Sequence, residues 1–394
     1  MATQTLQTPA PPTFMQGVAV PASAVNPPEF FARTRRHINM EQQFSYTGQP
    51  QQTIELRKSD ILSTLRIVFD GQVTITPGTG TVASTAAWPY DFLQRVDFTA
   101  NQSANLISVS GLKLKIREFM KRSDLNDRGV VQTFGGVSRN QGTLASSSES
   151  WGVGSNTSAL AAGTYPVHLE WILPVAEDEV DLAGAVFLAT SSSSLTATMQ
   201  LNTIANLFAL TGNGAAAITG NFQVISTKFS VPIGSQGQIV VPDLSMFHSL
   251  IQSRTANGVQ NGENELRLIG QGAGKSLLRA FYQVLNGTPP APLAMNATNF
   301  GKQMWRYATS ETPDSFIDGN HMRDDEERRY NTDVGALWGV GCHDFANENS
   351  FRDVVDEGTA AELRLVITIQ SGVVLSSPAV EYVTETMFSA GQGA

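Results

Sequence analysis

Short runs in which apolar and polar residues alternate recur along most of this chain, and they constrain its fold more than any other feature. Clear examples lie at 64–70, 72–76, 195–201 and 362–370, and LKLKIR at 112–117 follows the same pattern. A period of two places one set of side chains on a single face of a β-strand. Roughly fifteen such runs, separated by clusters of Gly, Ser, Asn or Pro, predict antiparallel sandwiches.

The length of the chain predicts more than one domain. Its 394 residues exceed the roughly 150 residues of an ordinary domain. Two eight-stranded jelly rolls need about sixteen strands, close to the number of alternating runs. We therefore predict an all-β fold, a double jelly roll of two sandwiches side by side, with short helices and long loops. The predicted parts are an extended N-terminal arm at 1–44, a first jelly roll at 45–232, a second at 233–386 and a C-terminal tail at 387–394.

The segment SVPIGSQGQIVVPDLS at 230–245 is the predicted boundary between the jelly rolls, because prolines and glycines punctuate it. A new strand, QIVV, is expected to begin inside it. Asp243 or Ser245 is expected to cap a following helix. The apolar side of that helix would carry Leu244, Phe247, His248 and Leu250. Long segments at 121–164 and 286–320 are predicted to be loops, which in compact sandwiches protrude or carry function.

The run YPVHLEWILPVAEDEVDLAGAVFL at 165–188 combines several signals. Its first half alternates, which predicts a half-buried strand that Pro174 ends. Acidic residues then lie where a following helix would have its positive dipole end. They are Glu177, Asp178, Glu179 and Asp181, followed by the apolar Leu182, Ala185 and Val186. We interpret the acidic residues as helix capping and subunit contact, and not as catalytic carboxylates.

Several segments resemble, in the same order along the chain, those of the double jelly-roll major capsid proteins of tailless, internal-membrane bacteriophages of the tectivirus type. They are DFLQRVDF at 91–98, VSGLKLKI at 109–116, the run at 165–188, the boundary at 230–245 and the segment at 322–342. The resemblance implies a major capsid protein whose pseudo-hexagonal homotrimers tile an icosahedral shell over an internal membrane. It also implies a place in the virion, assembly in the host cytoplasm, and neighbouring trimers, penton proteins and minor capsid proteins as partners.

The composition suits a subunit of an assembly. Charged residues are 15% of the chain, against about 25% in ordinary soluble proteins, which is typical of a surface largely hidden in contacts. The net charge of -9 argues against direct contact with nucleic acid, because phosphate neutralisation needs clustered Lys and Arg. Because the sequence shows neither a run of ~18 apolar residues nor a secretory signal, we expect no membrane span and no export.

Residues 1–29 are rich in proline and nearly uncharged, so they predict an extended arm. The candidate contact residues at its end are Phe30, Phe31, Arg33, Arg35 and Arg36. In one interpretation the arm ties a subunit to its neighbours, with the phenylalanines in a groove. In the other it contacts an anionic membrane surface, with aromatic groups inserted and arginines on headgroups. The resemblance favours the membrane, although the family has a helix where this arm is rich in proline.

The segment LIGQGAGKSLL at 268–278 imitates a phosphate-binding loop, because Gly-Lys-Ser follows an apolar run and leads into a further apolar segment. The spacing is wrong, since the fifth residue before Gly274 is Ile269, and Gly270 comes one residue too late. A shorter loop would point its N–H groups away from the phosphates. We therefore predict a glycine-rich hairpin between two strands, and no cofactor.

Cys342, His343 and Asp344 are the residue types of a thiol active site, but on a strand His343 faces away from the other two. Cys342, the single cysteine, is therefore expected to be a buried structural thiol. The pair His321 and Asp325 is alone a weak set of metal ligands.

The run RDDEERR at 323–329 predicts a solvated or interface helix. Asp324 lies opposite Arg328, and Asp325 opposite Arg329, at the i, i+4 spacing of helical ion pairs. The resemblance places this helix beside the second jelly roll. No catalytic, cofactor-binding or metal site is predicted.

Three functions are compatible with the residues. In the capsid subunit, two similar sandwiches per chain give a trimer six nearly equivalent edges for a hexagonal lattice. A jelly-roll carbohydrate-binding spike or fibre protein would hold ligand in its long loops, yet its tryptophans are scattered at 88, 151, 171, 305 and 338. A nucleotide hydrolase would use Lys275. We predict the capsid subunit, without enzyme activity.

Overall fold

The computed structural model describes most of the chain beyond its N-terminal segment. The described ranges are 27–85, 88–100, 104–121, 159–177, 181–188, 195–233, 239–268, 275–288, 290–307, 315–330, 334–346, 355–356 and 363–389. Strands dominate these ranges, and the helices are short. Among the helices of these ranges, none is long and apolar enough to cross a bilayer.

The first sandwich consists of two layers that face each other across one core. One layer has the strand order β1-β11-β3-β7, with β8 beside β3, and the other has the order β6-β5-β9-β2. Phe69 and Phe222 of the first layer share a core cluster with Phe98 and Met199 of the second. The strands are β1 (Arg36–Tyr46), β2 (Gln51–Glu55), β3 (Ile61–Thr76), β5 (Leu93–Ala100), β6 (Ala104–Val109), β7 (Gly163–Pro174), β8 (Val186–Phe187), β9 (Leu195–Leu201) and β11 (Ala215–Phe229).

The second sandwich repeats this plan. One layer has the order β13-β20-β16-β17; the other contains β14, β21 and β12, with β15, β18 and β19 paired to β14. Trp305 and Leu365 of the first layer share a core cluster with Tyr282 and Val380 of the second. The strands are β12 (Met246–Thr255), β13 (Gly262–Leu268), β14 (Lys275–Asn286), β15 (Ala291–Pro292), β16 (Phe300–Tyr307), β17 (Ser315–Phe316), β18 (Val340–Asp344), β19 (Val355–Asp356), β20 (Leu363–Ile369) and β21 (Ala379–Ser389).

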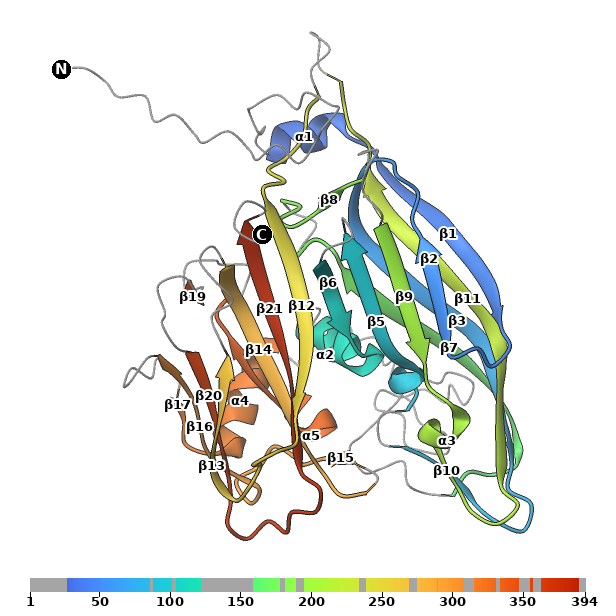
Figure 1. Cartoon of the computed structure of the whole chain (residues 1–394), viewed down its shortest axis with the longest axis vertical. Coiled ribbons are helices and arrows are strands. Elements are labelled where there is room, and N and C mark those ends of the chain that lie inside the picture. Colours follow the sequence, from blue (N-terminus) through green and yellow to red (C-terminus); the bar gives the residue numbers. More distant parts are fainter. Residues whose placement is uncertain are drawn as a thin grey trace, which may run out of the picture.

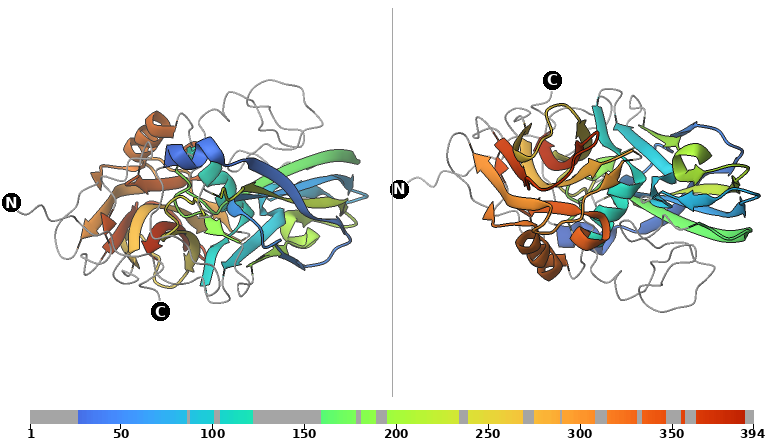
Figure 2. Two further views of the ribbon diagram at one scale, coloured as in Figure 1. Left: turned by 90° about the horizontal axis from the view of Figure 1, so that it is seen from above. Right: turned by 90° about the horizontal axis from the view of Figure 1, so that it is seen from below.

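One ten-stranded sheet continues through both sandwiches. Its two halves meet where β6 and β12 pair in parallel, with Ile107 opposite Leu250 and Ser108 opposite Ile251. The sandwiches therefore lie side by side (Figures 1 and 2). This arrangement confirms the predicted all-β class with two jelly-roll sandwiches in one chain. The remaining elements are β4 (Val82–Ser84), η1 (Tyr90–Phe92), α3 (Ile204–Leu207), β10 (Phe208–Leu210), α4 (Gly319–Tyr330) and α5 (Val334–Trp338).

Helix α2 (Gly111–Lys121) lies between the sandwiches, where a strand was predicted at 112–117 (Figure 1). That prediction is wrong because the run fits both periods: Leu112, Ile116 and Phe119 also share one helical face, and the neighbouring residues are good helix formers. All residues from Gly111 to Met120 are buried. The apolar side chains belong to the first core, while Lys113 and Arg117 reach the second sandwich.

A turn, and not the predicted helix at 177–186, follows β7 in the described residues. Leu182 and Gly184 have φ angles of 61° and 83°, which belong to the left-handed region and not to a right-handed helix. A Cβ at position 184 would lie 2.6 Å from the Cβ of His248, so the turn packs directly on β12. Asp178 and Glu179 lie outside the described residues.

The boundary segment also leads into a strand, because β12 begins at Met246 where a helix was predicted. Asp243 Oδ1 accepts the N–H of Ser245 at 2.9 Å, but this bond closes a turn. Pairing of β12 with β21 along its whole length outweighs the local capping signal. The expected QIVV strand is reduced to one bridge between Ile233 and Ile239.

The two predicted long loops differ in outcome. Strand β16 lies within 286–320 and pairs with β20, so this segment is not a loop throughout. A register shift between Phe300 and Gln303 interrupts its alternation, which hid the strand in the sequence. Most of the other predicted loop, 122–158, lies outside the described residues.

The end of the predicted arm belongs to the first sandwich. Helix α1 (Pro27–Arg33) precedes β1, which pairs with β11, so residues 27–44 are not an extended arm, and residues 1–26 lie outside the described residues. Likewise, β21 continues to Ser389 into the predicted C-terminal tail. Strand β1 escaped detection because its central residues are polar and a register shift between Met40 and Gln42 breaks the alternation.

Strand β1 is an edge strand with a charge directed inward. At its bulge, the carboxylate of Glu41 lies 2.7 Å from Lys228 Nζ, and both side chains are buried. Ser226 Oγ also donates to Glu41 at 2.5 Å. Burial alone would raise the pKa of Glu41, but the hydrogen bonds from Lys228 and Ser226 and the charge of Lys228 lower it.

Candidate functional surfaces and the junction between the sandwiches

A buried group of charged side chains joins the two sandwiches at α2. Glu385 on β21 is its centre: Oε1 accepts from Arg117 Nε at 3.0 Å, and Oε2 accepts from Arg279 NH1 at 2.7 Å. Burial alone would raise the pKa of Glu385, but Arg117, Arg279 and a hydrogen bond from His248 hold it well below its usual range. Glu385 is therefore a carboxylate at neutral pH.

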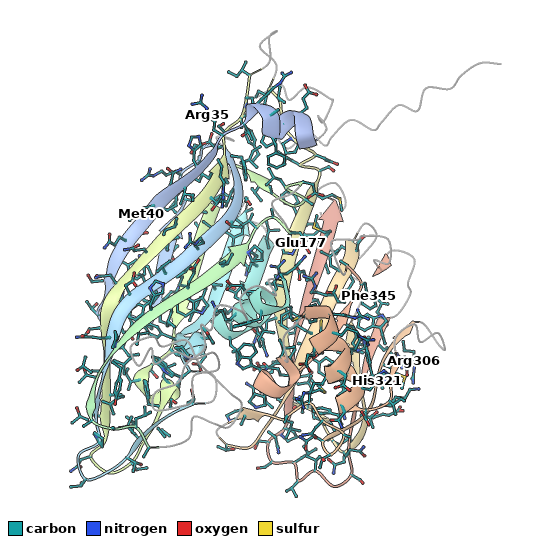
Figure 3. All side chains as sticks on the ribbon, turned by 180° about the vertical axis from the view of Figure 1, so that it is seen from behind. Arg35, Met40, Glu177, Arg306, His321 and Phe345 are labelled. Carbon is teal, nitrogen blue, oxygen red and sulfur yellow. The ribbon has the colours of Figure 1, made fainter. Side chains whose placement is uncertain are left out.

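Glu177 is the second carboxylate of this group, and it comes from the turn after β7. Lys121 Nζ lies 2.6 Å from it, and Arg279 NH2 lies at 3.5 Å. Arg279 also pairs with Asp344 through Nε at 3.4 Å. Glu177 was interpreted as a helix cap with a subunit contact, which is wrong because its side chain is 1% exposed and faces α2 (Figure 3).

His248 on β12 also belongs to this group. Its Nε2 lies 2.7 Å from Glu385 Oε1, and its Nδ1 lies 2.6 Å from the backbone carbonyl oxygen of Pro174. Both partner atoms are hydrogen-bond acceptors. His248 thus connects the end of β7 in the first sandwich with β21 in the second.

Lys113 forms a separate contact nearer the start of α2. Its Nζ lies 3.6 Å from Glu381 and donates to Gln283, whose Nε2 donates to the carbonyl oxygen of Trp338. Burial lowers the pKa of Lys113 to about 8, although Glu381 opposes this shift. Most of these groups are buried and pair with one another, so the junction holds the two sandwiches together.

The candidate contact residues at the N-terminal end separate into two sets. Phe30 is fully buried, and Phe30 and Phe31 pack on Phe229 with ring centroids 6.4 and 5.6 Å away. Arg33, Arg35 and Arg36 are exposed at the same end of the molecule, where Figure 3 labels Arg35. The phenylalanines therefore fill a core of their own chain, and the arginines alone face outward.

The strands on either side of the glycine-rich segment argue against a phosphate-binding loop. Lys275 begins strand β14, whereas a phosphate loop leads into a helix. The predicted hairpin is also wrong, because β13 and β14 lie in different sheets and do not pair with each other. The ammonium group of Lys275 lies 5.3 Å from the ring centroid of Phe388.

Cys342 and His343 lie on β18 and are buried, as the predicted strand implies. Burial and the neighbouring Asp344 raise the pKa of the Cys342 thiol well above its usual range. Neither ring nitrogen of His343 has a hydrogen-bond partner in the described part of the chain. Burial, with a smaller contribution from Arg329, lowers the pKa of His343 to about 3, so the ring is neutral.

The predicted helix at 323–329 is confirmed as part of α4. Asp325 pairs with Arg329 at 2.7 Å and with Arg328 at 2.8 Å. His321 donates its backbone N–H to Asp318 and packs against Phe316, without a ligand set beside Asp325. Within the described ranges, no three His, Cys, Asp or Glu side chains form a group that could hold a metal ion.

Comparisons with known proteins identify the fold. The major capsid protein of Sulfolobus Turreted Icosahedral Virus covers 90% of this chain with 97% of its own, at 14% identity and a TM-score of 0.64. The Faustovirus major capsid protein covers 95% with 92% of its own, at 8% identity and a TM-score of 0.53. The PBCV-1 virus capsid covers 91% with 95% of its own, at 10% identity and a TM-score of 0.54. No family model and no curated protein matches. The resemblance to double jelly-roll capsid proteins is thus confirmed at the level of the fold.

Replacing Glu385 by Gln should destabilise the protein strongly. The change leaves Arg117 and Arg279 buried beside a neutral amide, so we expect the free energy of unfolding to fall by about 3–5 kcal/mol. Glu265→Gln is the matched control, because Glu265 pairs with Arg306 at the surface, where a loss of less than about 1 kcal/mol is expected. Urea denaturation of both variants measures the difference. Equal losses would contradict the proposed role of the junction.

Replacing His343 by Leu should make the protein more resistant to acid. The folded pKa of about 3 lies below the unfolded value of 6.5, so the unfolded state binds more protons as the pH falls through this window. The free energy of unfolding then drops by up to about 1.4 kcal/mol per pH unit from this group alone. His343→Leu should flatten the acid side of the stability curve between pH 6 and 4, whereas the exposed His37→Leu should not. Urea unfolding midpoints of both variants and the parent protein, measured between pH 6 and 4, test this prediction.

Proposed function

We propose that this chain is the major capsid protein of an icosahedral virus. The observation that carries the proposal is the fold: two similar sandwiches lie side by side in one chain, and capsid proteins of this fold match nearly its full length. Homotrimers of such a chain present six similar sandwiches around one axis, which suits a hexagonal lattice. The proposed partners are neighbouring trimers, penton proteins and minor capsid proteins, and the proposed location is the virion.

The alternative of a carbohydrate-binding spike or fibre receives less support. Such sites commonly present aromatic side chains at the surface, in the loops that hold ligand. The tryptophans of the described residues are fully buried instead: Trp88, Trp171, Trp305 and Trp338. Trp151 lies outside the described residues.

We also infer that the basic N-terminal end faces an internal lipid membrane. The exposed arginines at 33, 35 and 36 lie on a chain whose overall charge is -9, so they form a local exception. Arginines next to a surface favour anionic headgroups by about 1 kcal/mol each. Because Phe30 and Phe31 pack within the chain, the proposed contact is electrostatic and does not involve insertion of these rings. The resemblance also implies a virus that infects bacteria, and this stays a prediction.

The purified protein should be a trimer in solution. Light scattering coupled to size-exclusion chromatography at micromolar concentration should give about three times the 42.3 kDa of one chain. Electron microscopy of the same material should show pseudo-hexagonal particles. A monodisperse monomer across the concentration range would contradict the capsid proposal.

The basic end should bind anionic vesicles. We expect the protein to co-sediment with vesicles that contain phosphatidylserine, less so at high salt, and not with vesicles of phosphatidylcholine alone. The triple variant Arg33→Gln, Arg35→Gln, Arg36→Gln should lose this binding. The control removes the same charge from the second sandwich, through Arg306→Gln, Arg328→Gln and Arg364→Gln. If the first variant binds like the parent protein, the membrane contact is wrong and contact with a neighbouring subunit is favoured.

A further inference from the structure

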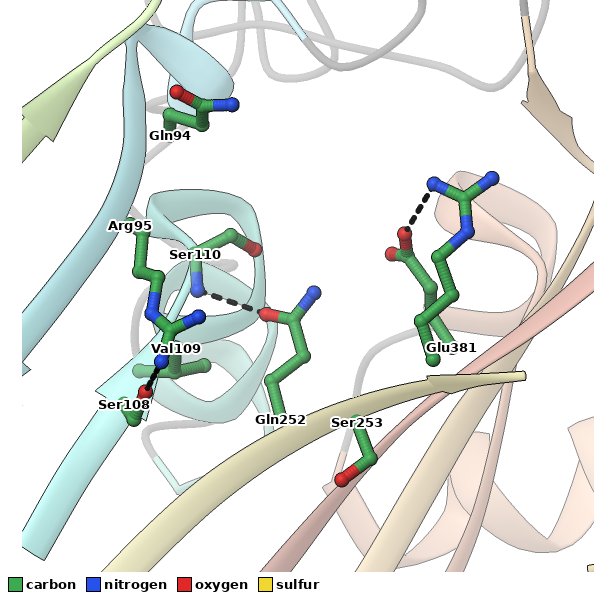
Figure 4. A pocket seen from close by; sticks show the side chains of 9 residues that line it. Gln94, Arg95, Ser108, Val109, Ser110, Gln252, Ser253 and Glu381 are labelled. Carbon is green, nitrogen blue, oxygen red and sulfur yellow. Dashed lines mark hydrogen bonds and ion pairs between the residues drawn. The ribbon is translucent and has the colours of Figure 1, made fainter. Parts of the chain in front are cut away.

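A polar cavity of about 230 Å³ lies on the line where the two sandwiches meet (Figure 4). Residues from both sandwiches line it, because it sits beside the parallel pairing of β6 with β12. From the first sandwich come Gln94, Arg95, Ser108, Val109 and Ser110, and from the second come Gln252, Ser253, Arg254 and Glu381. Val109 is the single apolar side chain among them. The cavity belongs neither to the buried charge group around Glu385 nor to the N-terminal end.

Acceptor atoms of Gln252, Asp97 and Glu381 at this cavity are already engaged. Gln252 Oε1 accepts the backbone N–H of Ser110 at 2.8 Å. Asp97 Oδ1 accepts from Arg95 Nε at 2.9 Å and from Ser108 Oγ at 2.6 Å. The two oxygens of Glu381 face Arg254 at 3.4 Å and Lys113 at 3.6 Å. The carboxylates beside the cavity are therefore already paired with cations of the chain.

Donors, in contrast, have spare capacity. A guanidinium group carries five N–H bonds, of which Arg254 uses one in its contact with Glu381 and Arg95 uses two. Because Gln252 Oε1 accepts the N–H of Ser110, the Nε2 group of the same amide is directed toward the cavity (Figure 4). The side chains of Arg95 and Arg254 are each half exposed, so they can reach a ligand.

The net charge beside the cavity is positive, which favours the same kind of ligand as the excess of hydrogen-bond donors. Arg95 is balanced by Asp97, but the single charge of Glu381 is shared between Arg254 and Lys113. One positive charge, shared by Arg254 of β12 and Lys113 of α2, is therefore left over beside the cavity. A small acceptor that carries negative charge satisfies both the geometry and the charge.

We propose that this cavity binds a carboxylate between Arg95, Gln252 and Arg254. The volume fits a small organic acid or one acidic side chain, and it is too small for a nucleotide. The carboxylate can come from solution or from an Asp or Glu of a second copy, since the chain carries 35 acidic against 26 basic residues. A carboxylate from a second copy requires the proposed assembly, whereas binding of a free acid at the site does not.

The decisive variant is Gln252→Glu. It keeps an oxygen for the N–H of Ser110 and replaces the free donor by a second carboxylate oxygen, so the fold is retained while the ligand is repelled. Titration calorimetry with sodium malonate, against sodium chloride of equal ionic strength, should show binding to the parent protein. The affinity should fall at least tenfold in Gln252→Glu and in the double variant Arg95→Gln, Arg254→Gln. Gln43→Glu, the same charge change on the exposed edge strand β1, should bind like the parent.

Self-association distinguishes the two sources of the carboxylate. If a neighbouring copy supplies it, Gln252→Glu should weaken the oligomer in sedimentation velocity, and malonate should compete with assembly of the parent. If a free acid supplies it, malonate binds and the oligomer is unchanged. Equal malonate binding in the parent and Gln252→Glu overturns the site. No malonate binding together with an unaltered oligomer in Gln252→Glu also overturns it, and leaves the capsid proposal intact.

Discussion

The pairing of Glu385 with Arg117 and Arg279 is the interaction on which the arrangement of the two sandwiches depends. Arg117 and Glu385 are separated by 268 positions in the sequence, and each belongs to a different sandwich. Removing one partner from a buried ion pair leaves an uncompensated charge, which costs several kcal/mol. Helix α2 can therefore be buried in the first sandwich only when β21 of the second lies against it. The two jelly rolls form one structural unit because of this requirement.

The same requirement explains why α2 is buried on every side. Its apolar residues complete the core of the first sandwich, and Lys113 and Arg117 contact β21 of the second. The parallel pairing of β6 with β12 fixes the position of this contact. Sheet continuity and the ion pairs thus act at the same junction. Each sandwich alone would expose residues at this junction that the other sandwich covers.

Much of the fold could be predicted from alternation alone, as in β7, β9 and β20, since each has one buried face and one polar face. The predictions failed where tertiary contacts, and not the local sequence, determine the secondary structure. LKLKIR fits a strand or a helix, and only its place between two sandwiches selects α2. Strands β1 and β16 contain register shifts, which break the period of two that reveals a strand. Strand β12 follows a turn with a capping side chain, which imitates the start of a helix.

The functional surfaces were less predictable than the strands. Glu177 lies in an acidic run that suggests a helix start, and its true partners, Lys121 and Arg279, lie far away in the sequence. The cluster at 30–36 was found from its residue types, but burial separated its phenylalanines from its arginines. The donor-rich cavity uses residues from β5, β6, β12 and β21 that share no motif. Spacing along the chain carries no signal for such sites.

The buried Glu41 on edge strand β1 protects this edge against pairing with a strand of another chain. An exposed edge strand offers free N–H and C=O groups to any other strand, and a protein made in many copies would aggregate through it. The bulge beside Glu41 interrupts that row of groups, and a strand added there would disturb the buried pair with Lys228. Side-chain contacts are then the favoured route to association. Under the proposed assembly, this edge disfavours strand addition between copies that have not yet met through their side-chain surfaces.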